Sequence, residues 1–556
     1  MTEFKHPSPD SSPPRRRAPY RARVIAVALI LLPGLWSATG AGGSPSGELF
    51  AQNAPADAVQ SASQSPLERM VRIRVVVNLY RPLRPYAAPE IQEWIGSGIW
   101  LGDGRILTDL YLVRFASVIE YWEPGVDPAQ ARPTVATLAH RGFDCGLAVI
   151  AESSEGANPK LSADVAALFP DQSVAVGQEL KVFGFGSDSG SPDAGRDSSK
   201  ARGVLVREYE AAGAIAGSDI DRHALYRVAP TRGSKAPDRG FSGGPAVLED
   251  RFVGIYINEE RAGGSYVLAP EVVRSFLADV AAEGRYDGFP RTGLHFESIG
   301  TEAARRYLGL ESAKLTSGVL VRRVDFQSAA WGKVSPGDVL LAANDKALDF
   351  AGRIVVTPKE RVPFQRWLQS LPGAPLKLKL LRKGGPAEVT LDLESPALRS
   401  PGPGRSRLLD QPKYFLGGGL VFQELEYDLI HARPVDQAEH APAPRAEPEI
   451  LHRYFNYYTD RIGEQVDRDL ILTARLPDPV NSDADRFLNG IVRSVNGRRI
   501  RNLKDFAAEW SYTREAYVVI EFLNYDQPLI LDFEATQKAE ERIRTRYRLQ
   551  ENGRVR

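Results

Sequence analysis

The chain has 556 residues, 43% of them hydrophobic and 25% charged, a composition that is typical of folded domains. Its length predicts roughly three or four domains rather than one. Lys and Arg together number 70, as do Asp and Glu, so the net charge gives no reason to expect a nucleic-acid partner. Cys145 is the single cysteine, which excludes an intrachain disulfide and a cysteine-ligated metal cluster. We expect no metal and no organic cofactor.

The N-terminus is typical of a secretory signal. A polar and basic stretch is followed by the apolar run "VIAVALILLPGLW" at 24–36 and then by small residues. The apolar run is shorter than the ~20 residues that a membrane-spanning helix needs. We therefore predict a signal peptide over residues 1–41 and an exported chain, periplasmic or extracellular, with no membrane span after cleavage. The alternative is a membrane anchor formed by residues 24–36.

Three folded units follow a flexible Gly-, Ser- and Pro-rich linker at 42–66. Residues 67–286 contain many short apolar strands separated by turns, which favours a barrel or sandwich closed by a helix at 270–283. The stretches "GIVRSVNGRRIRNLKDFAAEW" and "GDVLLAANDKAL" resemble one another, which indicates a repeated module. The predicted later segments are an α+β unit at 290–397, a linker at 398–412, an α+β unit at 413–536 with a Pro- and Glu-rich loop at 433–449, and a charged, solvent-exposed helical tail at 537–556.

The stretch "GFSGGP" at 240–245 could present a nucleophile. A serine hydrolase needs a nucleophile, a base, a group that orients the base, and N–H donors for the oxyanion. The glycines let the backbone turn sharply, so the N–H groups of Gly240 and Ser242 could point at one oxygen and form the oxyanion hole. The alternative is that Ser242 is an ordinary turn residue with no catalytic role.

Three stretches together resemble the HtrA/Deg family of trypsin-like serine proteases with PDZ domains. They are "GSGIWLGDGRILTDLYLV" at 96–113, "FDCGLAVI" at 143–150 and "GFSGGPAVLEDRFVGIYI" at 240–257. The C-terminal third is similar to the plant Deg-type branch with a divergent second PDZ domain, as in "PKYFLGGGLVFQELE" at 412–426. The resemblance implies a mostly β fold, a trypsin-like double β-barrel followed by two PDZ-like α+β domains. It also implies homo-oligomers that bind unfolded proteins or protein C-termini.

The family's catalytic triad is degenerate in this sequence. The resemblance places Tyr111 at the position of the histidine and Gly146 at the position of the aspartate, and only Ser242 remains. A phenol with a pKa near ~10 is a poor general base at neutral pH. Relocated partners are an alternative: His140 with Asp144, although His140 reads more simply as a surface residue near a turn, or His223, which has no partner that we can name.

Three functions stay open on these residues. The first is an exported pseudoprotease that holds unfolded chains or C-termini. The second is an active serine endopeptidase of periplasmic protein quality control that uses Ser242 with a non-standard base. The third is a regulatory subunit that assembles with an active relative.

Peptide binding is predicted for the second unit. The stretch "TGLHFE" at 292–297 lies where the family's carboxylate-binding loop precedes an edge strand, and free N–H groups there would hold a peptide C-terminus. Peptide-binding residues would be Gly293, Leu294, His295 and Phe296. The alternative is that Leu294 and Phe296 are ordinary core residues, and His295 is expected to face solvent. In the third unit, "FLGGGLVF" at 415–422 is a weaker candidate, and that domain would serve self-assembly.

Overall fold

The computed structural model describes residues 65–555 apart from short internal segments. These segments are residues 129, 154–160, 171, 173, 186–199, 214–221, 260–263, 312, 314, 316, 325–327, 358–360, 370, 372–374, 394–410, 433–450, 452–453, 456–467 and 513–514. Several predicted features therefore lie outside the described residues, wholly or nearly so: the signal peptide or anchor, the linkers at 42–66 and 398–412, and the loop at 433–449.

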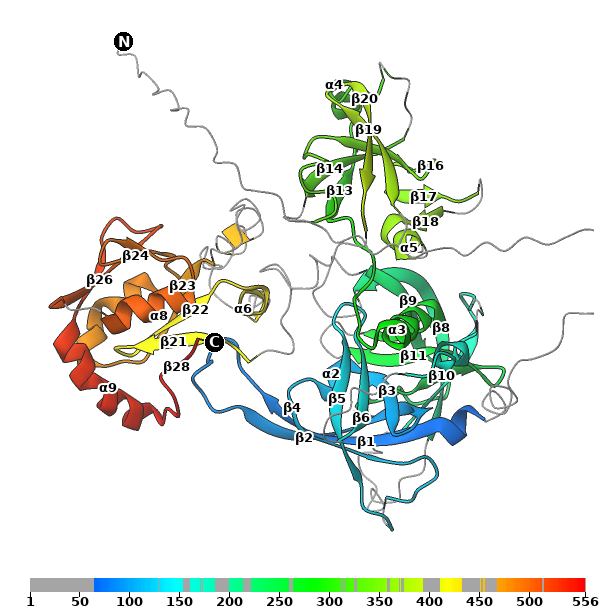
Figure 1. The fold of residues 1–556 in the computed structure, drawn as a ribbon, viewed down its shortest axis with the longest axis horizontal. Coiled ribbons are helices and arrows are strands. Elements are labelled where there is room, and N and C mark those ends of the chain that lie inside the picture. The colour runs from blue at the N-terminus through cyan, green and yellow to red at the C-terminus, as the bar shows by residue number, and fades with distance from the viewer. Residues whose placement is uncertain are drawn as a thin grey trace, which may run out of the picture. The chain divides into compact units, whose positions relative to one another are not determined.

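Six antiparallel strands close into a first barrel in the order β1-β2-β3-β6-β5-β4 (Figure 1). They are β1 (Met70–Leu79), β2 (Glu90–Gly102), β3 (Arg105–Asp109), β4 (Ala116–Trp122), β5 (Thr134–Gly142) and β6 (Leu147–Glu152), with the 3-10 turn η1 (Pro66–Arg69) before β1 and the short helix α2 (Leu110–Val113) after β3. Every second residue of β1, from Val71 to Val77, is apolar and fully buried. This alternation is the pattern of a strand with one face on a core.

A second closed barrel has the order β10-β11-β12-β9-β8-β7. Its strands are β7 (Glu179–Gly184), β8 (Lys200–Gly213), β9 (Arg222–Pro230), β10 (Pro245–Leu248), β11 (Arg251–Glu259) and β12 (Gly264–Leu268), accompanied by the 3-10 turns η2 (Val165–Leu168) and η3 (Arg239–Phe241) and the helix α3 (Pro270–Glu283). Helix α3 begins with Pro270 in its first turn and ends at Gly284, whose left-handed conformation is typical of a C-terminal cap. The two barrels confirm the predicted trypsin-like architecture.

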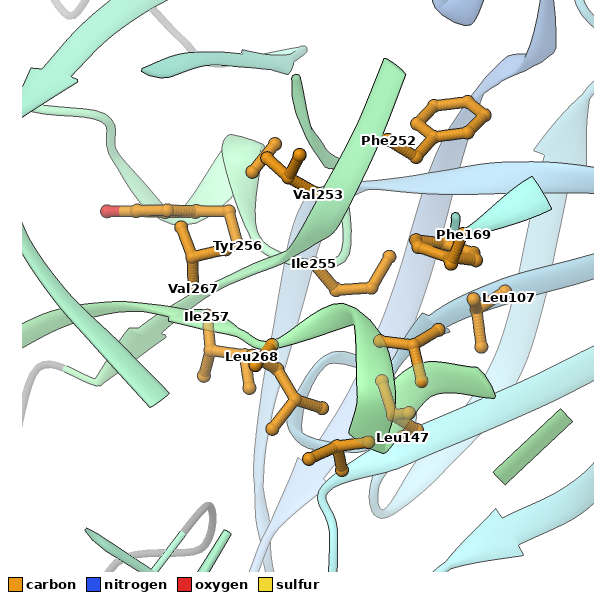
Figure 2. Close-up of a cluster of buried hydrophobic side chains, with 14 of the residues drawn as sticks. Leu107, Leu147, Phe169, Phe252, Val253, Ile255, Tyr256, Ile257, Val267 and Leu268 are labelled. Atoms are coloured by element: carbon orange, nitrogen blue, oxygen red, sulfur yellow. The ribbon is translucent and has the colours of Figure 1, made fainter. Parts of the chain in front are cut away.

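One hydrophobic cluster spans both barrels (Figure 2). Leu107 on β3 and Leu147 on β6 pack in the same cluster as Phe252 and Ile255 on β11 and Phe169 in the connection between the barrels. All five side chains are buried. Because β3 ends next to this shared core and η3 leads into β10, side chains from the two barrels can meet there.

The second unit is a six-stranded sheet in the order β13-β14-β15-β19-β20, with β16 paired to β15. Its elements are β13 (Leu294–Ser298), α4 (Glu302–Tyr307), β14 (Val319–Val324), β15 (Val339–Ala343), β16 (Lys346–Ala347), α5 (Phe364–Gln369), β19 (Leu376–Arg382) and β20 (Gly385–Leu391), together with the separate hairpin of β17 (Arg353–Val355) and β18 (Arg361–Pro363). A two-residue hairpin joins β19 and β20. Its turn places Lys383 and Gly384 at positive φ, as a two-residue type I′ turn requires.

The third unit has two four-stranded sheets, in the orders β23-β22-β21-β28 and β25-β24-β26-β27. Its elements are β21 (Tyr414–Gly417), β22 (Leu420–Glu424), α6 (Tyr427–His431), β23 (Leu470–Arg475), η5 (Pro479–Phe487), β24 (Val492–Val495), β25 (Arg498–Arg499), α8 (Leu503–Tyr512), β26 (Tyr517–Phe522), β27 (Leu529–Asp532), α9 (Phe533–Tyr547) and β28 (Gly553–Arg554).

The C-terminal segment differs from the predicted solvent-exposed tail at 537–556. The predicted boundary falls inside α9, and Thr536, Ala539 and Ile543 form a buried face of that helix. After the helix, Gly553 and Arg554 pair with β21. The charged residues of α9 lie mostly on its outer face and outnumber the small and apolar residues of the narrow buried face, so the composition alone predicts an exposed helix. The segment is therefore part of the third unit.

Candidate active site

The backbone around Ser242 is held by the first barrel. Ser242 accepts a hydrogen bond at its carbonyl from the N–H of Ser97, 3.0 Å away. The Ser97 hydroxyl donates to the carbonyl of Gly240 at 2.6 Å, and it accepts from the N–H of Phe185. Ser97 lies on β2, so one buried hydroxyl joins β2 to the serine turn and to the residue after β7. No motif singled out Ser97, because its partners are distant in sequence.

Gly243 follows the serine in a conformation that only glycine adopts easily. Its φ is 83°, and a Cβ atom there would clash with the carbonyl oxygen of Ser97 and with Oγ1 of Thr108. The glycine-rich motif is thus explained by the close approach of the two barrels at this point. The explanation holds with or without catalysis.

The predicted oxyanion hole is not formed in this structure. Residues Arg239–Phe241 make a 3-10 turn, in which the N–H of Ser242 donates to the carbonyl of Arg239 at 2.9 Å. The N–H of Gly240 donates to the side chain of Asp238, also at 2.9 Å. Both N–H groups therefore have acceptors within the protein. The expectation that they point together at one substrate oxygen is wrong for this conformation, because the glycine turn winds back on itself.

The Ser242 hydroxyl donates to a carboxylate that the sequence did not single out. Its Oγ lies 2.6 Å from Oδ2 of Asp109, a residue 133 positions earlier in the chain. Both side chains are buried, with exposed fractions of 3% and 1%. Burial raises the pKa of Asp109 to about 6, although the hydrogen bond from Ser242 and the charge of Arg114 oppose the shift. The one local signal was "TD" ahead of a short helix, the signature of an N-cap.

Tyr111, which the sequence places at the histidine position, lies on α2 two residues after Asp109. Its backbone N–H donates to Oδ1 of Asp109 at 2.9 Å. The half-buried ring of Tyr111 lies under the guanidinium of Arg114, 4.2 Å from the ring centroid. This is a cation–π contact. The tyrosine thus contributes its backbone to the Asp109 carboxylate, and its ring packs against a cation.

Gly146, at the predicted aspartate position, has a structural role in the turn before β6. Its φ is 75°, and its carbonyl accepts from the N–H of Leu110 at 2.8 Å. This bond ties α2 to the first barrel. A side chain at position 146 would have to adopt the left-handed conformation, which asparagine and aspartate tolerate better than other non-glycine residues.

Asp144 holds the segment that follows α3. Its carboxylate accepts from the hydroxyl of Tyr286 at 2.5 Å, from the N–H of Phe289 at 3.0 Å and from Arg291 at 3.1 Å. The Arg291 and Asp144 side chains are 6% and 0% exposed. Such a buried, multiply bonded ion pair is typical of a structural anchor. Asp144 is thus committed to residues 286–291.

The two remaining candidate bases are His140 and His223. His140, read from the sequence as a surface residue, is 5% exposed and lies on β5 opposite Val149. Strand β5 closes the barrel against β6, which explains why this position is buried. The backbone of His223 is part of β9, but its side chain lies outside the described residues.

The predicted peptide-binding strand is β13, at the edge of its sheet. Gly293 has a φ of 73°, as a turn into the strand requires. Leu294 and Phe296 are half-buried against the core of the unit, and the Phe296 ring makes an edge contact with Phe364 on α5 at 5.6 Å. Both residues therefore pack on the core of the unit, and Phe296 also contacts α5.

Two details of that loop differ from the prediction. The N–H of Leu294 donates to the Thr292 hydroxyl at 3.2 Å, so it is not free for a carboxylate in this conformation. His295 is half-buried rather than solvent-facing, and its Nε2 lies 2.9 Å from a guanidinium nitrogen of Arg323 on the paired strand β14.

The glycine loop of the third unit is packed from inside. Asn481 donates through its side-chain amide to the carbonyl of Gly418 at 2.7 Å. A Cβ atom on Gly417 would fall 2.5 Å from the ring of Trp510, and one on Gly419 would fall 2.5 Å from Asn481. These glycines allow close packing of the loop on its own domain. They are not arranged as an open carboxylate-binding loop.

Comparisons with known proteins agree with this architecture. The family model "PDZ domain" matches residues 405–553. Protease Do-like 2, chloroplastic, from Arabidopsis thaliana is 27% identical over 80% of this chain and 68% of its own length. Protease Do-like 4, mitochondrial, from the same plant is 23% identical over 82% of this chain and 78% of its own length.

Solved structures of HtrA-type proteases are also similar. The HtrA-type protease AlgW with a tripeptide has 15% sequence identity and a TM-score of 0.39, covering 60% of this chain and 96% of that one. The serine endoprotease from Yersinia pestis has 15% identity and a TM-score of 0.33, covering 61% and 98%. Within the described residues, no helix has the length and apolar character needed to cross a bilayer.

Two closed six-stranded barrels, with a PDZ domain matched at residues 405–553, define a trypsin-like protease fold with a PDZ domain. The serine turn lies where the two barrels contact one another. The chain is similar to proteases of the HtrA/Deg family, and plant Deg proteases are among its relatives.

Proposed function

We propose that this protein is an HtrA/Deg-type pseudoprotease that binds unfolded proteins or protein C-termini in protein quality control and does not cleave them. One observation carries the proposal: both expected oxyanion donors, the N–H groups of Gly240 and Ser242, are hydrogen-bonded to protein atoms in a buried turn. Tyr111 and Gly146 at the two other triad positions support it.

The magnitudes favour binding over cleavage. Loss of triad members lowers turnover by roughly 10⁴- to 10⁶-fold. Loss of a single oxyanion donor costs a further 10²–10³-fold or so. A site that lacks the imidazole and whose oxyanion donors are engaged would hydrolyse peptide bonds too slowly to matter in a cell.

Binding is supported by the geometry of β13. Edge strands can accept a peptide as an additional strand, and β13 pairs only with β14 among the described strands. Phe296 on β13 and Phe364 on α5 offer apolar contacts to such a peptide. The Thr292 hydroxyl would have to release the Leu294 N–H for a terminal carboxylate to bind there.

The expected location and assembly complete the proposal. Export rests on the signal-like residues 1–41, which predict a periplasmic or extracellular chain, whereas the curated relatives are named as chloroplastic or mitochondrial. Family-type assembly would make the protein a homo-oligomer.

Cleavage of unfolded casein by the purified chain tests the catalytic half of the proposal. Wild type is compared with Ser242→Ala and with a Tyr111→His/Gly146→Asp double variant, which restores the family's residues. We expect wild type and Ser242→Ala to be equally inert. Cleavage by wild type that is lost in Ser242→Ala would overturn the proposal in favour of an active endopeptidase.

Peptide titration tests the binding half. A fluorescent peptide with an apolar C-terminal residue and a free carboxylate is titrated with the full chain, beside the same peptide with an amidated end. Tighter binding of the free acid that weakens in Phe296→Ala supports the proposal. Equal, weak affinities for both peptides and for casein would contradict it.

A further inference from the structure

We propose that Ser242 and Asp109 form a nucleophilic dyad that accepts acyl groups from activated esters or thioesters, with Asp109 as the base. The inference goes beyond the proposed function, because it assigns a reaction to a site that does not cut peptides. It starts from one contact: Oγ of Ser242 donates to Oδ2 of Asp109 across 2.6 Å. This is the distance at which a hydroxyl can pass its proton to a base.

The carboxylate is oriented for this contact. The backbone N–H of Tyr111 donates to Oδ1 of Asp109, which leaves Oδ2 for the serine. Nucleophile, base and orienting group are therefore present in one hydrogen-bonded line. In a trypsin-type site, a histidine is the base and an aspartate orients it. Here a carboxylate and a backbone amide occupy the two roles, and they reach the serine from β3 and α2.

The environment gives the carboxylate the basicity that the reaction needs. Asp109 is 1% exposed, and burial raises its pKa to about 6, close to the ~6.5 of an ordinary imidazole. Arg114, at the end of α2, is the charged side chain that acts on it among the described residues, and it lowers the pKa. The hydroxyl of Ser242, the residue after η3, donates a hydrogen bond to Asp109 and also lowers its pKa.

The presence of a charge at this position calls for an explanation. Position 109 caps a helix of only four residues, and serine or asparagine would cap it equally well without burying a charge. A buried carboxyl whose pKa is raised lowers the stability of the folded protein at neutral pH. Groups that are kept at such a cost are typical of functional sites.

The reaction balances without a cofactor. The Oγ–H bond of Ser242 breaks, its proton goes to Oδ2 of Asp109, and Oγ forms a bond to the acyl carbon. The bond from that carbon to the leaving group then breaks, and the leaving group departs with its electron pair and takes up the proton. The products are a Ser242 ester and the protonated leaving group.

Activated acyl groups fit this site better than peptides. An amide needs strong oxyanion stabilisation and a proton donor for its amine, and here the N–H groups of Gly240 and Ser242 already have acceptors. A phenolate or thiolate leaves without that help. The dyad can thus be acylated although the chain cleaves no peptide bond.

Labelling with a small fluorophosphonate and acetylation by p-nitrophenyl acetate test the inference on the full-length protein. With the fluorophosphonate, Oγ of Ser242 forms its bond to phosphorus, the P–F bond breaks, and fluoride is the leaving group. Wild type is compared with Ser242→Ala, Asp109→Asn and the matched control Asp349→Asn. Asp349 is another buried aspartate that accepts backbone N–H groups, but it lies in the second unit.

We expect one modified serine per chain in wild type and in Asp349→Asn, and none at that residue in Ser242→Ala. Asp109→Asn should react about 100-fold more slowly, the usual size of a base effect. The wild-type rate should rise with pH to a plateau, with a midpoint near the pKa of Asp109, about 6. Equal rates in wild type and folded Asp109→Asn, or no wild-type labelling at any pH, would overturn the inference.

Folding of the variants is checked by thermal melting and by the peptide titration above. If Asp109→Asn does not fold, the wild-type pH profile decides alone: a rate without the inflection rejects Asp109 as the base. The outcome is separate from the proposed function, because labelling can fail while casein remains bound and uncut, and casein binding can fail while Ser242 is labelled.

Discussion

At the scale of single residues, Asp109 departs most from what the sequence indicated. The stretch "TDLYLV" resembles the family's histidine motif and places the lost histidine at Tyr111, two residues after this carboxylate. The structure connects Asp109 to the nucleophile position, while Tyr111 stacks on Arg114. The side chain that contacts Ser242 is therefore Asp109 and not Tyr111, the residue at the position of the lost histidine.

The stability of the protein should depend on pH through Asp109. Its folded pKa of about 6 exceeds the usual 3.8, so the protonated form is favoured by folding. The associated stability is complete below about pH 3.8 and is lost as pH rises through 6, a change of about 3 kcal/mol for a two-unit shift. Urea unfolding of wild type and Asp109→Asn across this window measures it. A difference between the two that stays constant with pH would contradict this assignment.

Gly243 should tolerate no side chain. In Gly243→Ala, the new Cβ would clash with Ser97 and Thr108, so we expect a loss of about 2 kcal/mol or more in the free energy of unfolding. The control is Gly233→Ala, because Gly233 has a similar φ of 85° and open space around it. It should show only the strain of the left-handed conformation, about 1 kcal/mol. Equal losses in both variants would mean that backbone strain alone explains the glycine.

At the scale of elements, α9 illustrates how packing overrides composition. The helix contains many charged residues, and its sequence was interpreted as a solvent-exposed tail. Ala539 and Ile543 nevertheless face the core of the third unit, and Arg542 on the same helix binds the buried Asp478 through two hydrogen bonds. Two or three inward side chains are enough to fix a helix that is otherwise polar.

Ile543→Ala should therefore destabilise the third unit. The side chain is 1% exposed, and removal of a buried isoleucine costs about 2–5 kcal/mol. Hydrogen exchange of the full chain should show faster exchange in α9 and β21, with the barrels unaffected. Glu541→Ala, on the exposed face of the same helix, is the control and should leave exchange unchanged. Equal protection of the α9 amides in both variants would mean that Ile543 does not anchor the helix to the third unit.

At the scale of the whole molecule, the largest hydrophobic clusters are separate. One joins the two barrels, one lies in the second unit and one lies in the third unit, with smaller clusters in each part. Separate cores permit separate unfolding events, so no single free energy describes the chain.

Calorimetry should consequently resolve more than one transition in thermal unfolding. Phe364→Ala removes a side chain that is 3% exposed from the core of the second unit. It should lower the temperature of one transition by several degrees, since a loss of about 3 kcal/mol is expected for a buried phenylalanine. The transition of the barrels should not move. A single transition that shifts as a whole would mean that the units unfold together.

The amino-acid sequence by itself determined the architecture and the order of the units. Strand alternation in β1 and the glycine turn at Ser242 are local patterns, and local backbone preferences act over a few residues. Such patterns need no knowledge of distant partners.

Only the tertiary structure decided what surrounds the serine. The contact of Ser242 with Asp109 joins residues 133 positions apart, and that of Ser97 with Gly240 joins residues 143 apart. These contacts form because burial of a shared apolar core brings the chain segments together, and burial is a property of the whole fold rather than of any short stretch.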